Sequence, residues 1–309
     1  MKIIVTGGAG FIGSHIVDAY VKKGHGVSII DDLSSGKKEY INPGASFYRA
    51  DINDKEEIDR IIDKEKPAVI NHHAAQISVR NSVENPINDA MINILGFLNL
   101  LEAARKNSIK KIIFASSGGV VYGDAKIIPT SEVYMPLQPL SPYGITKLCT
   151  ENYLHYYHKS YGISYTALRY SNIYGPRQNP HGEAGVVAIF SLKLLKGLKP
   201  VINGTGNQTR DYLYVGDVVA ANILALNPGI EGSFNIGTGI ETSVNEVYGF
   251  IKNIVKSDIP AIHGPAKKAE QERSCLDASK AERIMGWKPE IKLFEGLQKT
   301  VNFFQNNEK

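Results

Sequence analysis

Two side chains with complementary chemistry, Tyr143 and Lys147, stand four residues apart. On a helix, positions i and i+4 share one face, so the Lys147 ammonium would lie near the Tyr143 phenol. A nearby cation stabilises a phenolate and lowers the pKa of tyrosine from its usual value of about 10, which suits a general base. By spacing alone, a tyrosine and a lysine stacked on a solvated helix face are the commoner explanation, so the remaining motifs decide.

A glycine-rich turn near the start of the chain predicts a dinucleotide site. The apolar run 2–5 predicts a buried strand, Thr6-Gly7-Gly8-Ala9-Gly10 a turn, and Phe11-Ile12-Gly13 the start of a helix. Glycine allows the turn to be tight and lets the backbone approach a pyrophosphate, which the free N–H groups and dipole of the helix attract. The alternative is an ordinary tight turn between a strand and a helix.

The next strand supports the dinucleotide interpretation and favours NAD. It covers 27–30 and ends at Asp31, 18 residues after Gly13. A carboxylate in this place accepts hydrogen bonds from adenosine ribose hydroxyls and would repel the 2′-phosphate of NADP. We therefore expect NAD as the cofactor.

Strands and helices alternate through the first half, which predicts a doubly wound parallel sheet of the α/β class with helices on both faces. Cofactor and substrate should then bind beyond the carboxyl ends of the strands. The expected strands are 46–50, 68–72, 111–115 and 165–168, and the expected helices are 56–64 and 86–106. The candidates at the carboxyl ends are Asp31, Asp51, His73, Ala74, Gln76, Ser116 and Ser117.

The second half is less regular and predicts a smaller lobe that closes over a substrate. It contains expected helices over 186–196, 243–256 and 294–304, and a polar, glycine-rich loop over 204–211. We predict a Rossmann-type NAD-binding domain over 1–168, to which part of 212–239 returns. The α/β substrate lobe mainly covers 169–309.

Composition sets further bounds. A chain of 309 residues with 43% hydrophobic and 21% charged residues is typical of one large globular domain or two intimate ones. A net charge of +4 does not suggest nucleic acid, and two cysteines are too few for a disulfide framework. No long uncharged apolar stretch is present and Met1 leads directly into the first strand, so we expect a cytoplasmic enzyme without membrane association.

The pair His72-His73 is the one feature that suggests a metal. Adjacent side chains on a strand point to opposite faces, so the two rings do not form a natural ligand pair. No cysteine or carboxylate cluster accompanies them, and we expect no metal.

Together these motifs resemble the extended short-chain dehydrogenase/reductase family, and within it the UDP-glucose (UDP-galactose) 4-epimerases. The resemblance covers nearly the whole chain. It rests on 6–13, Asn93 with Gly96, Tyr143 with Lys147, 168–177, 208–211, 234–237 and 286–289.

The resemblance implies a mechanism for the Tyr143–Lys147 pair. Tyr143 takes the proton of the sugar 4-hydroxyl while hydride passes from C4 to NAD⁺. The resulting 4-keto sugar turns over in the pocket and receives hydride on its opposite face, so C4 inverts. Lys147 also holds the nicotinamide ribose. A homodimer is expected on the same ground.

The resemblance also gives the site residues. The expected cofactor-binding residues are Gly7, Gly10, Phe11, Ile12, Gly13, Asp31, Asp32, Ser34, Ser35, Gly36, Asp51, Ile52, His73, Ala74, Ala75, Gln76, Asn93, Ser116, Tyr143, Lys147 and Tyr170. The expected UDP-sugar-binding residues are Ser117, Tyr143, Asn172, Val186, Val187, Val201, Asn203, Arg210 and Lys267. The Arg210 guanidinium suits a diphosphate, and the alternative for it is an ion pair with Asp211.

The chain departs from the family pattern at three places. Gly118 stands where the family has the serine or threonine four residues before the tyrosine of Val-Tyr-Gly. We predict that Ser117 supplies this hydroxyl, with Ser116 a structural or cofactor-side hydroxyl. Lys267 stands in place of a second diphosphate-binding arginine, which keeps the charge without the planar fork. Gly216-Asp217 replaces an Asp-Asp pair and has no functional interpretation from the sequence.

Several alternatives remain. Another UDP-sugar-modifying enzyme of the family, such as a UDP-N-acetylglucosamine or UDP-glucuronate 4-epimerase, would share these motifs. A 4,6-dehydratase is disfavoured because Gly119 and Val120 replace its acidic pair, and an NADPH-dependent reductase is disfavoured by Asp31. A catalytically silent NAD-binding regulator is disfavoured because Tyr143, Lys147, Asn172 and Arg210 are retained together.

Overall fold

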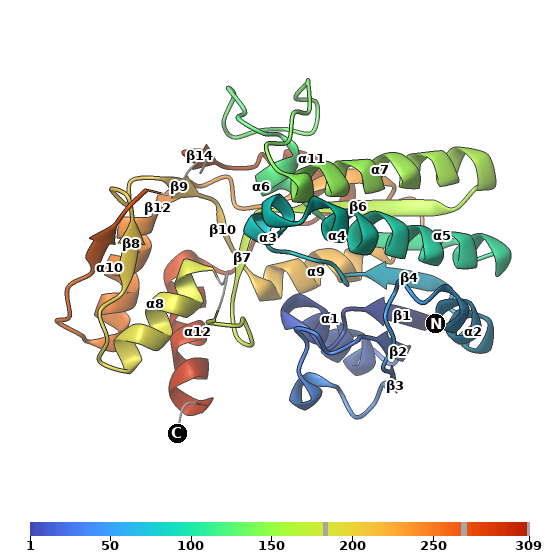
Figure 1. Ribbon diagram of the computed structural model, residues 1–309, viewed down its shortest axis with the longest axis horizontal. Coiled ribbons are helices and arrows are strands. Elements are labelled where there is room, and N and C mark those ends of the chain that lie inside the picture. The colour runs from blue at the N-terminus through green and yellow to red at the C-terminus, as the bar shows by residue number, and fades with distance from the viewer. Residues whose placement is uncertain (182–184, 267–270, 308–309) are drawn as a thin grey trace.

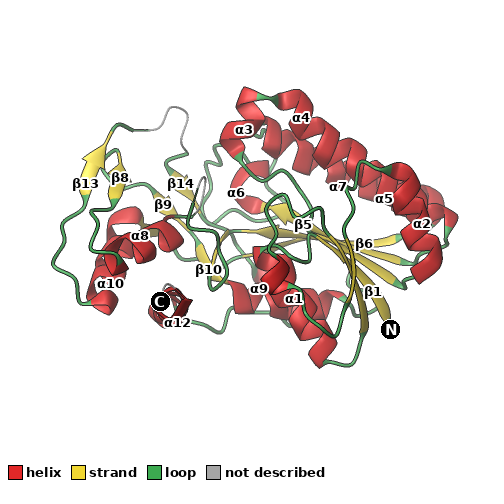
Figure 2. Cartoon of the chain, turned by 60° about the horizontal axis from the view of Figure 1, so that its bottom comes forward, coloured by secondary structure: helices red, strands yellow, loops and turns green. Residues whose placement is uncertain are grey.

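The computed structural model of the chain describes residues 1–181, 185–266 and 271–307. Its centre is a seven-stranded sheet in the order β11-β6-β5-β4-β1-β2-β3, in which every neighbouring pair is parallel (Figures 1 and 2). The strand order reverses beside β1, which creates the crevice where such sheets bind ligands. The strands are β1 (Lys2–Thr6), β2 (Gly26–Ile30), β3 (Ser46–Tyr48), β4 (Val69–His72), β5 (Lys111–Ser117), β6 (Ser164–Tyr170) and β11 (Gly232–Ile236).

Helices cover both faces of the sheet because its central strands carry apolar side chains on both sides. Ile3 and Val5 of β1 belong to one buried cluster, with the helices α1 (Phe11–Lys22) and α9 (Val215–Ala225). Ile4, between them in the sequence, belongs to the other cluster. The helices α2 (Lys55–Glu65), α5 (Gly96–Lys106) and α7 (Pro142–Tyr161) supply that second layer. The predicted doubly wound parallel sheet is confirmed.

The expected helix over 86–106 contains an interruption that the sequence did not predict. It consists of α4 (Pro86–Ala90), a π-helical turn η2 (Met91–Leu95) and α5. A π-turn accommodates one extra residue and rotates the side chains on either side of it. Asn93, at the centre of η2, is buried and hydrogen-bonded to Gln76.

The second lobe lies at the carboxyl edge of the sheet and has its own hydrophobic core (Figure 1). Its main helices are α8 (Val186–Leu195), α10 (Val244–Val255) and α12 (Leu293–Asn307). Its short strands are β7 (Asn172–Tyr174), β8 (Val201–Asn203), β9 (Thr209–Arg210), β10 (Tyr212–Tyr214), β12 (Thr242–Ser243), β13 (Ile262–Gly264) and β14 (Arg273–Ser274). Ser243 and Glu246 form a capping box at the start of α10.

The shorter connecting elements complete the chain. They are η1 (Lys38–Tyr40), α3 (Val79–Glu84), α6 (Gly118–Val121) and α11 (Ser279–Met285). Across the residues that the structure describes, no helix is long and apolar enough to cross a membrane.

Candidate active site

The glycine turn brings the backbone of β1 and β4 into close contact. Gly7 has a φ of +68°, and a Cβ there would lie 2.6 Å from the Ala74 amide nitrogen. A Cβ at Gly13 would collide with the Gly7 carbonyl oxygen. The hydrogen bond from the Ser14 amide to the Gly10 carbonyl closes the first turn of α1, so the preceding N–H groups point off the helix end. This backbone cradle fits a pyrophosphate.

Asp31 stands beside this cradle, at the carboxyl end of β2. Its carboxylate accepts hydrogen bonds from the Ala9 amide at 3.0 Å and the Leu33 amide at 2.9 Å. Burial raises the pKa of Asp31, although these two hydrogen bonds oppose the change. A Cβ at Gly36 would lie 2.7 Å from the Asp31 Oδ1 atom, so glycine lets the following loop close over the carboxylate. Asp32, in contrast, accepts from the amide and hydroxyl of exposed Ser34.

His73 follows β4, and a hydrogen-bond chain joins its ring to two other side chains. The Asn222 side-chain amide donates to the Tyr170 hydroxyl at 2.8 Å, and that hydroxyl lies 3.1 Å from the His73 Nε2 atom. Burial lowers the pKa of His73 to about 3, so the ring is neutral. The end of β6 is thus joined to the end of β4 through Tyr170 and His73, two of the predicted cofactor-binding residues.

A buried polar cluster links the segment after β4 to α7. Asn93 and Gln76 exchange two hydrogen bonds, from the Gln76 amide at 2.9 Å and to its carbonyl at 3.0 Å. Asp89 is fully buried and accepts from the side chains of Asn93, Gln76 and Thr146. Asp89 was not predicted as a site residue, because in the sequence it resembles an ordinary polar residue of a helix. Its spacing of four residues from Asn93 is the signal that could have found it.

Tyr143, Lys147 and Ser117 meet at the carboxyl end of β5. Tyr143 lies in the first turn of α7, which Ser141 caps by accepting from the Gly144 amide at 3.1 Å. The Ser117 side chain faces the Tyr143 hydroxyl and acts to lower its pKa. The Lys147 Nζ atom donates to the Ala115 carbonyl at 2.9 Å and lies 5.6 Å from the Tyr143 ring centroid. Tyr143 and Lys147, the predicted i, i+4 pair, therefore both lie on the side of α7 that faces Ser117.

The pKa of Tyr143 shifts opposite to the direction predicted from its spacing. Burial raises it above the ordinary tyrosine value, Asp89 adds to the rise, and the Ser117 side chain opposes it. The protein alone therefore does not show the lowered pKa, which was predicted from the charges of Lys147 and the nicotinamide ring together. Burial also lowers the pKa of Lys147 to about 8, against the attraction of Asp89 and Glu151.

The two serines of β5 point to opposite faces, as strand geometry requires. The Ser116 hydroxyl is buried and donates to the Glu151 Oε1 atom at 2.5 Å, while Ser117 faces Tyr143. The Ser116 hydroxyl thus has a structural role, and a contact of this residue with the cofactor stays a prediction. A Cβ at Gly118 would be directed at Leu276, 2.5 Å from its Cδ1 atom.

The second lobe contributes further residues to this region. The Asn172 Oδ1 and Ser117 Oγ atoms both lie 3.9 Å from the place of a Cβ at Gly119, so they border the same space. Arg210 stands in β9, in register with Ser274 of β14. The Asp211 carboxylate accepts hydrogen bonds from the amides of Thr238, Gly239 and Leu276. These amides satisfy the carboxylate, so the alternative of an ion pair with Arg210 is not needed to explain its burial.

The other predicted substrate- and cofactor-binding residues differ in how far they are buried. Val187 is 1% exposed and packs in the core of the second lobe, so the predicted contact with a substrate would involve its backbone. Val186 begins α8 and is half-buried, and Val201 and Asn203 lie in β8. Ile52 is buried and lies against Gly96, while Asp51 is exposed. Lys267 lies outside the described residues.

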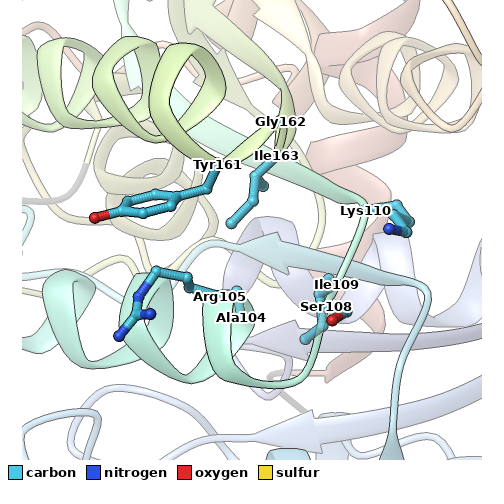
Figure 3. Close-up of a pocket in the computed structure, with 8 residues that line it drawn as sticks. All are labelled: Ala104, Arg105, Ser108, Ile109, Lys110, Tyr161, Gly162 and Ile163. Atoms are coloured by element: carbon cyan, nitrogen blue, oxygen red, sulfur yellow. The ribbon is translucent and has the colours of Figure 1, made fainter.

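A hollow of about 100 Å³ lies away from this site. It is bordered by the ends of α5 and α7 and the residues that follow them, including Arg105, Ser108 and Tyr161 (Figure 3). These residues lie at the amino ends of β5 and β6, whereas ligands of such sheets bind at the carboxyl ends. Within the described residues, no group of three or more His, Cys, Asp or Glu side chains could hold a metal ion.

Comparison with known proteins places this geometry in a family. A UDP-glucose 4-epimerase from Mycolicibacterium smegmatis is 46% identical over 313 residues, covering 99% of each chain. The structure of a Thermotoga maritima UDP-glucose 4-epimerase with UDP-glucose superposes with a TM-score of 0.98 at 48% identity, covering 100% of both chains. A Thermus thermophilus UDP-glucose 4-epimerase in complex with NAD gives 0.95 at 42% identity, covering 99% of this chain and 100% of that one. Residues 3–237 match the NAD dependent epimerase/dehydratase family, and the chain belongs to it.

Proposed function

We propose that this protein is an NAD-dependent UDP-glucose 4-epimerase. The observation that carries the proposal is that Ser117, Tyr143 and Lys147 come together at the carboxyl end of the sheet. Relatives at 46% and 48% identity are named UDP-glucose 4-epimerases, and one of them was solved with UDP-glucose. The likeness extends over the whole of both chains, so it includes the substrate lobe.

The cradle of Gly7, Gly10 and Gly13 would hold the pyrophosphate of NAD, and Asp31 the adenosine ribose. His73 and Tyr170 would border the nicotinamide half, and Lys147 would hold its ribose. When bound, NAD⁺ supplies the hydride acceptor and a positive charge that lowers the pKa of Tyr143.

The protein's own residues move the proton. Tyr143 takes the proton of the sugar 4-hydroxyl as C4 loses hydride, and returns it when C4 is reduced on the other face. Ser117 donates a hydrogen bond to the same oxygen as it becomes a carbonyl. Lys147 keeps its ammonium on this side of α7, where it favours the phenolate during the transfer.

The second lobe would hold the UDP group. Arg210 is suited to the diphosphate because a guanidinium donates two parallel hydrogen bonds to phosphate oxygens. Asn172 borders the space next to Ser117 and would bind where the diphosphate joins the sugar. Val186, Val201 and Asn203 would line the nucleotide end.

The test is product formation by purified protein supplied with UDP-galactose and NAD. We expect UDP-glucose as the product, with no net consumption of NAD and a transient rise in reduced-nicotinamide absorbance. UDP-N-acetylgalactosamine and UDP-galacturonate are assayed in parallel. Turnover of one of these without turnover of UDP-galactose would replace the substrate, and nucleotide binding without any turnover would favour a regulator.

We further propose a homodimer formed by α4, η2 and α7. Ile87, Met91 and Leu95 recur at helical spacing and are 73%, 48% and 54% exposed in the single chain. Tyr156 of α7 is also exposed, and it borders a shallow hollow with Cys149 and Tyr153. A contiguous apolar surface of this kind is typical of a protein interface.

We also propose a cytoplasmic location, because the reaction draws on the cytoplasmic pool of NAD and nucleotide sugars. We propose a role in galactose metabolism as well.

A further inference from the structure

Leu276 follows β14 and lies directly against the turn that follows Ser117. A Cβ at Gly118 would lie 2.5 Å from the Leu276 Cδ1 atom and 2.8 Å from its Cδ2 atom. Leu276 is 1% exposed and packs with Val121 of α6 and with Tyr122, which follows that helix. Because Ser117 is the N-cap of α6, the leucine presses on the turn that sets the direction of the Ser117 side chain.

Hydrogen bonds fix the backbone of Leu276 on both sides. Its amide donates to the Asp211 carboxylate at 3.2 Å. The Thr130 amide donates to the Cys275 carbonyl at 2.9 Å, and the Asp277 amide donates to the Thr130 carbonyl at 2.9 Å. The leucine is therefore held in place against Gly118 rather than resting there loosely.

The opposite side of β5 is fixed as well. The Ser116 hydroxyl donates to Glu151, whose carboxylate also accepts three hydrogen bonds from Arg169 at 2.7–3.2 Å. Ser117 thus lies between a residue tied to a buried ion pair and a glycine covered by a fixed leucine. With both neighbours held, strand alternation leaves the Ser117 hydroxyl directed at Tyr143.

The segment that carries Leu276 also reaches the proposed diphosphate site. Ser274 of β14 is paired in register with Arg210 of β9, two residues before Leu276. Asp211, the neighbour of Arg210, is the acceptor for the Leu276 amide. A single short segment therefore contacts both the Arg210 strand and the Ser117 turn.

We propose that Leu276 is a positioning residue that keeps the Ser117 hydroxyl on Tyr143 and links that hydroxyl to the strand of Arg210. The inference rests on the proposed function, in which Ser117 acts on the sugar oxygen. Leu276 fills the space that a side chain at position 118 would occupy. The proposal therefore explains why glycine stands there and why Ser117 supplies the hydroxyl.

The first experiment measures kcat and KM for UDP-galactose, bound NAD and thermal stability of the holoenzyme. Leu276→Ala should lower kcat on the order of 10- to 100-fold, because a small misplacement of a reacting group costs that much, while KM and bound NAD change little. Leu297→Ala is the matched control, since Leu297 is equally buried but lies in the second-lobe core. It should lower the melting temperature without lowering kcat. Leu276→Met, which keeps the volume, should retain activity.

A double variant separates positioning from packing. In the Ser117→Ala background, Leu276→Ala should cause no further loss of kcat, because the group that it positions is gone. Full additivity of the two losses would overturn the inference, as would Leu276→Ala with wild-type kcat and lowered stability. Wild-type kcat in Ser117→Ala itself would overturn the role of Ser117, and with it the inference. Absence of product from wild-type protein would instead refute the proposed function.

A volume exchange provides a second test in case Leu276→Ala does not fold. Leu276→Val removes the two Cδ atoms over Gly118, and Gly118→Ala adds a methyl group into that space. Each single variant should be slow, and the double variant should be faster than either. A double variant as slow as the slower single one would contradict the proposal.

Discussion

Tyr143 can act as a base only if nearby positive charges oppose the rise in its pKa that burial causes. The phenol lies in a site where desolvation raises its pKa, with buried Asp89 nearby, so the protein alone favours the neutral hydroxyl. The positive charges of Lys147 and of oxidised NAD then act in the other direction. This arrangement couples the general base to cofactor binding, since proton abstraction is favoured when the hydride acceptor is present.

Removal of the Tyr143 hydroxyl tests this role. Tyr143→Phe should reduce kcat by at least about 10²–10⁴-fold, the usual contribution of a general base, and leave NAD bound. Tyr248→Phe is a suitable control, because it removes a hydroxyl that donates to the Ile259 carbonyl in the second lobe. Conversion of UDP-galactose by each purified variant gives the comparison. Near-wild-type turnover in Tyr143→Phe would contradict the assignment.

Asp31 determines the choice of cofactor. Two backbone amides already bind its carboxylate, so a 2′-phosphate would meet a fixed and buried negative charge. Like charges at a partly buried contact cost several kcal/mol, and we expect NADP to bind roughly 10²-fold or more weakly than NAD. Calorimetric titration of cofactor-free protein with both nucleotides measures the ratio. Comparable dissociation constants would refute the prediction, and Asp31→Asn should narrow the difference.

At the scale of elements, β5 shows why alternation matters more than sequence position. Its two terminal serines have the same chemistry, yet Ser116 joins the buried Glu151–Arg169 pair and Ser117 joins Tyr143. Ser116→Ala should therefore destabilise the protein by about 1–3 kcal/mol, because a buried acceptor loses its donor, with a modest effect on kcat. Ser117→Ala should slow turnover about 10²-fold with little change in stability. Denaturant unfolding gives the stability of each variant, and steady-state kinetics give its kcat. A large loss of kcat in Ser116→Ala with normal kcat in Ser117→Ala would exchange the two roles.

The sequence predicted the strands and helices of the sheet because their signals are local. Continuous apolar runs identified β1, β2 and β5, and helical periodicity identified the helices. The π-turn at 91–95 was not predictable in this way, because it depends on fitting Asn93 against Gln76 across the chain. The two-residue strands β9 and β14 are too short for any periodicity, although they bring Ser274 beside Arg210.

The pair Gly216-Asp217, which had no functional interpretation from the sequence, has a structural one. The Asp217 carboxylate accepts from the amides of Glu290 and Ile291, and its backbone carbonyl accepts from the Trp287 indole at 2.9 Å. A Cβ at Gly216 would lie 2.9 Å from the Tyr214 ring. These contacts tie the segment before α12 to α9, a long-range connection that no local pattern reveals.

At the scale of the whole molecule, buried neutral groups limit the pH range of stability. Burial raises the pKa of Tyr20, Tyr143 and Tyr170, so above about pH 10 the unfolded chain loses protons that the folded chain keeps, and stability falls. Burial lowers the pKa of His72 and His73, so below about pH 6.5 the unfolded chain gains protons that the folded chain does not, and stability falls again. The melting temperature measured against pH should therefore pass through a maximum between these limits. A steady rise through pH 11 would contradict the alkaline limb.

The exposed apolar side chains of η2 predict that the chain assembles with a second copy. Met91 and Leu95 stand one helical turn apart on the outer surface of η2, and both are about half exposed in the single chain. A dimer would bury them, and a stable interface needs about 1,000 Å² or more of total buried area. Sedimentation equilibrium should give twice the chain mass of 33.9 kDa.

Leu95→Glu places a charge in that interface and should shift the protein to the monomer, whereas Ile240→Glu should not. Ile240 is a fair control because it is 65% exposed, and it lies in a turn of the second lobe away from these helices. Secondary structure and bound NAD should be unchanged in both variants, since neither residue contacts the core of the sheet. A monomeric wild-type protein, or a Leu95→Glu variant that remains dimeric, would show that the second copy, if any, binds elsewhere.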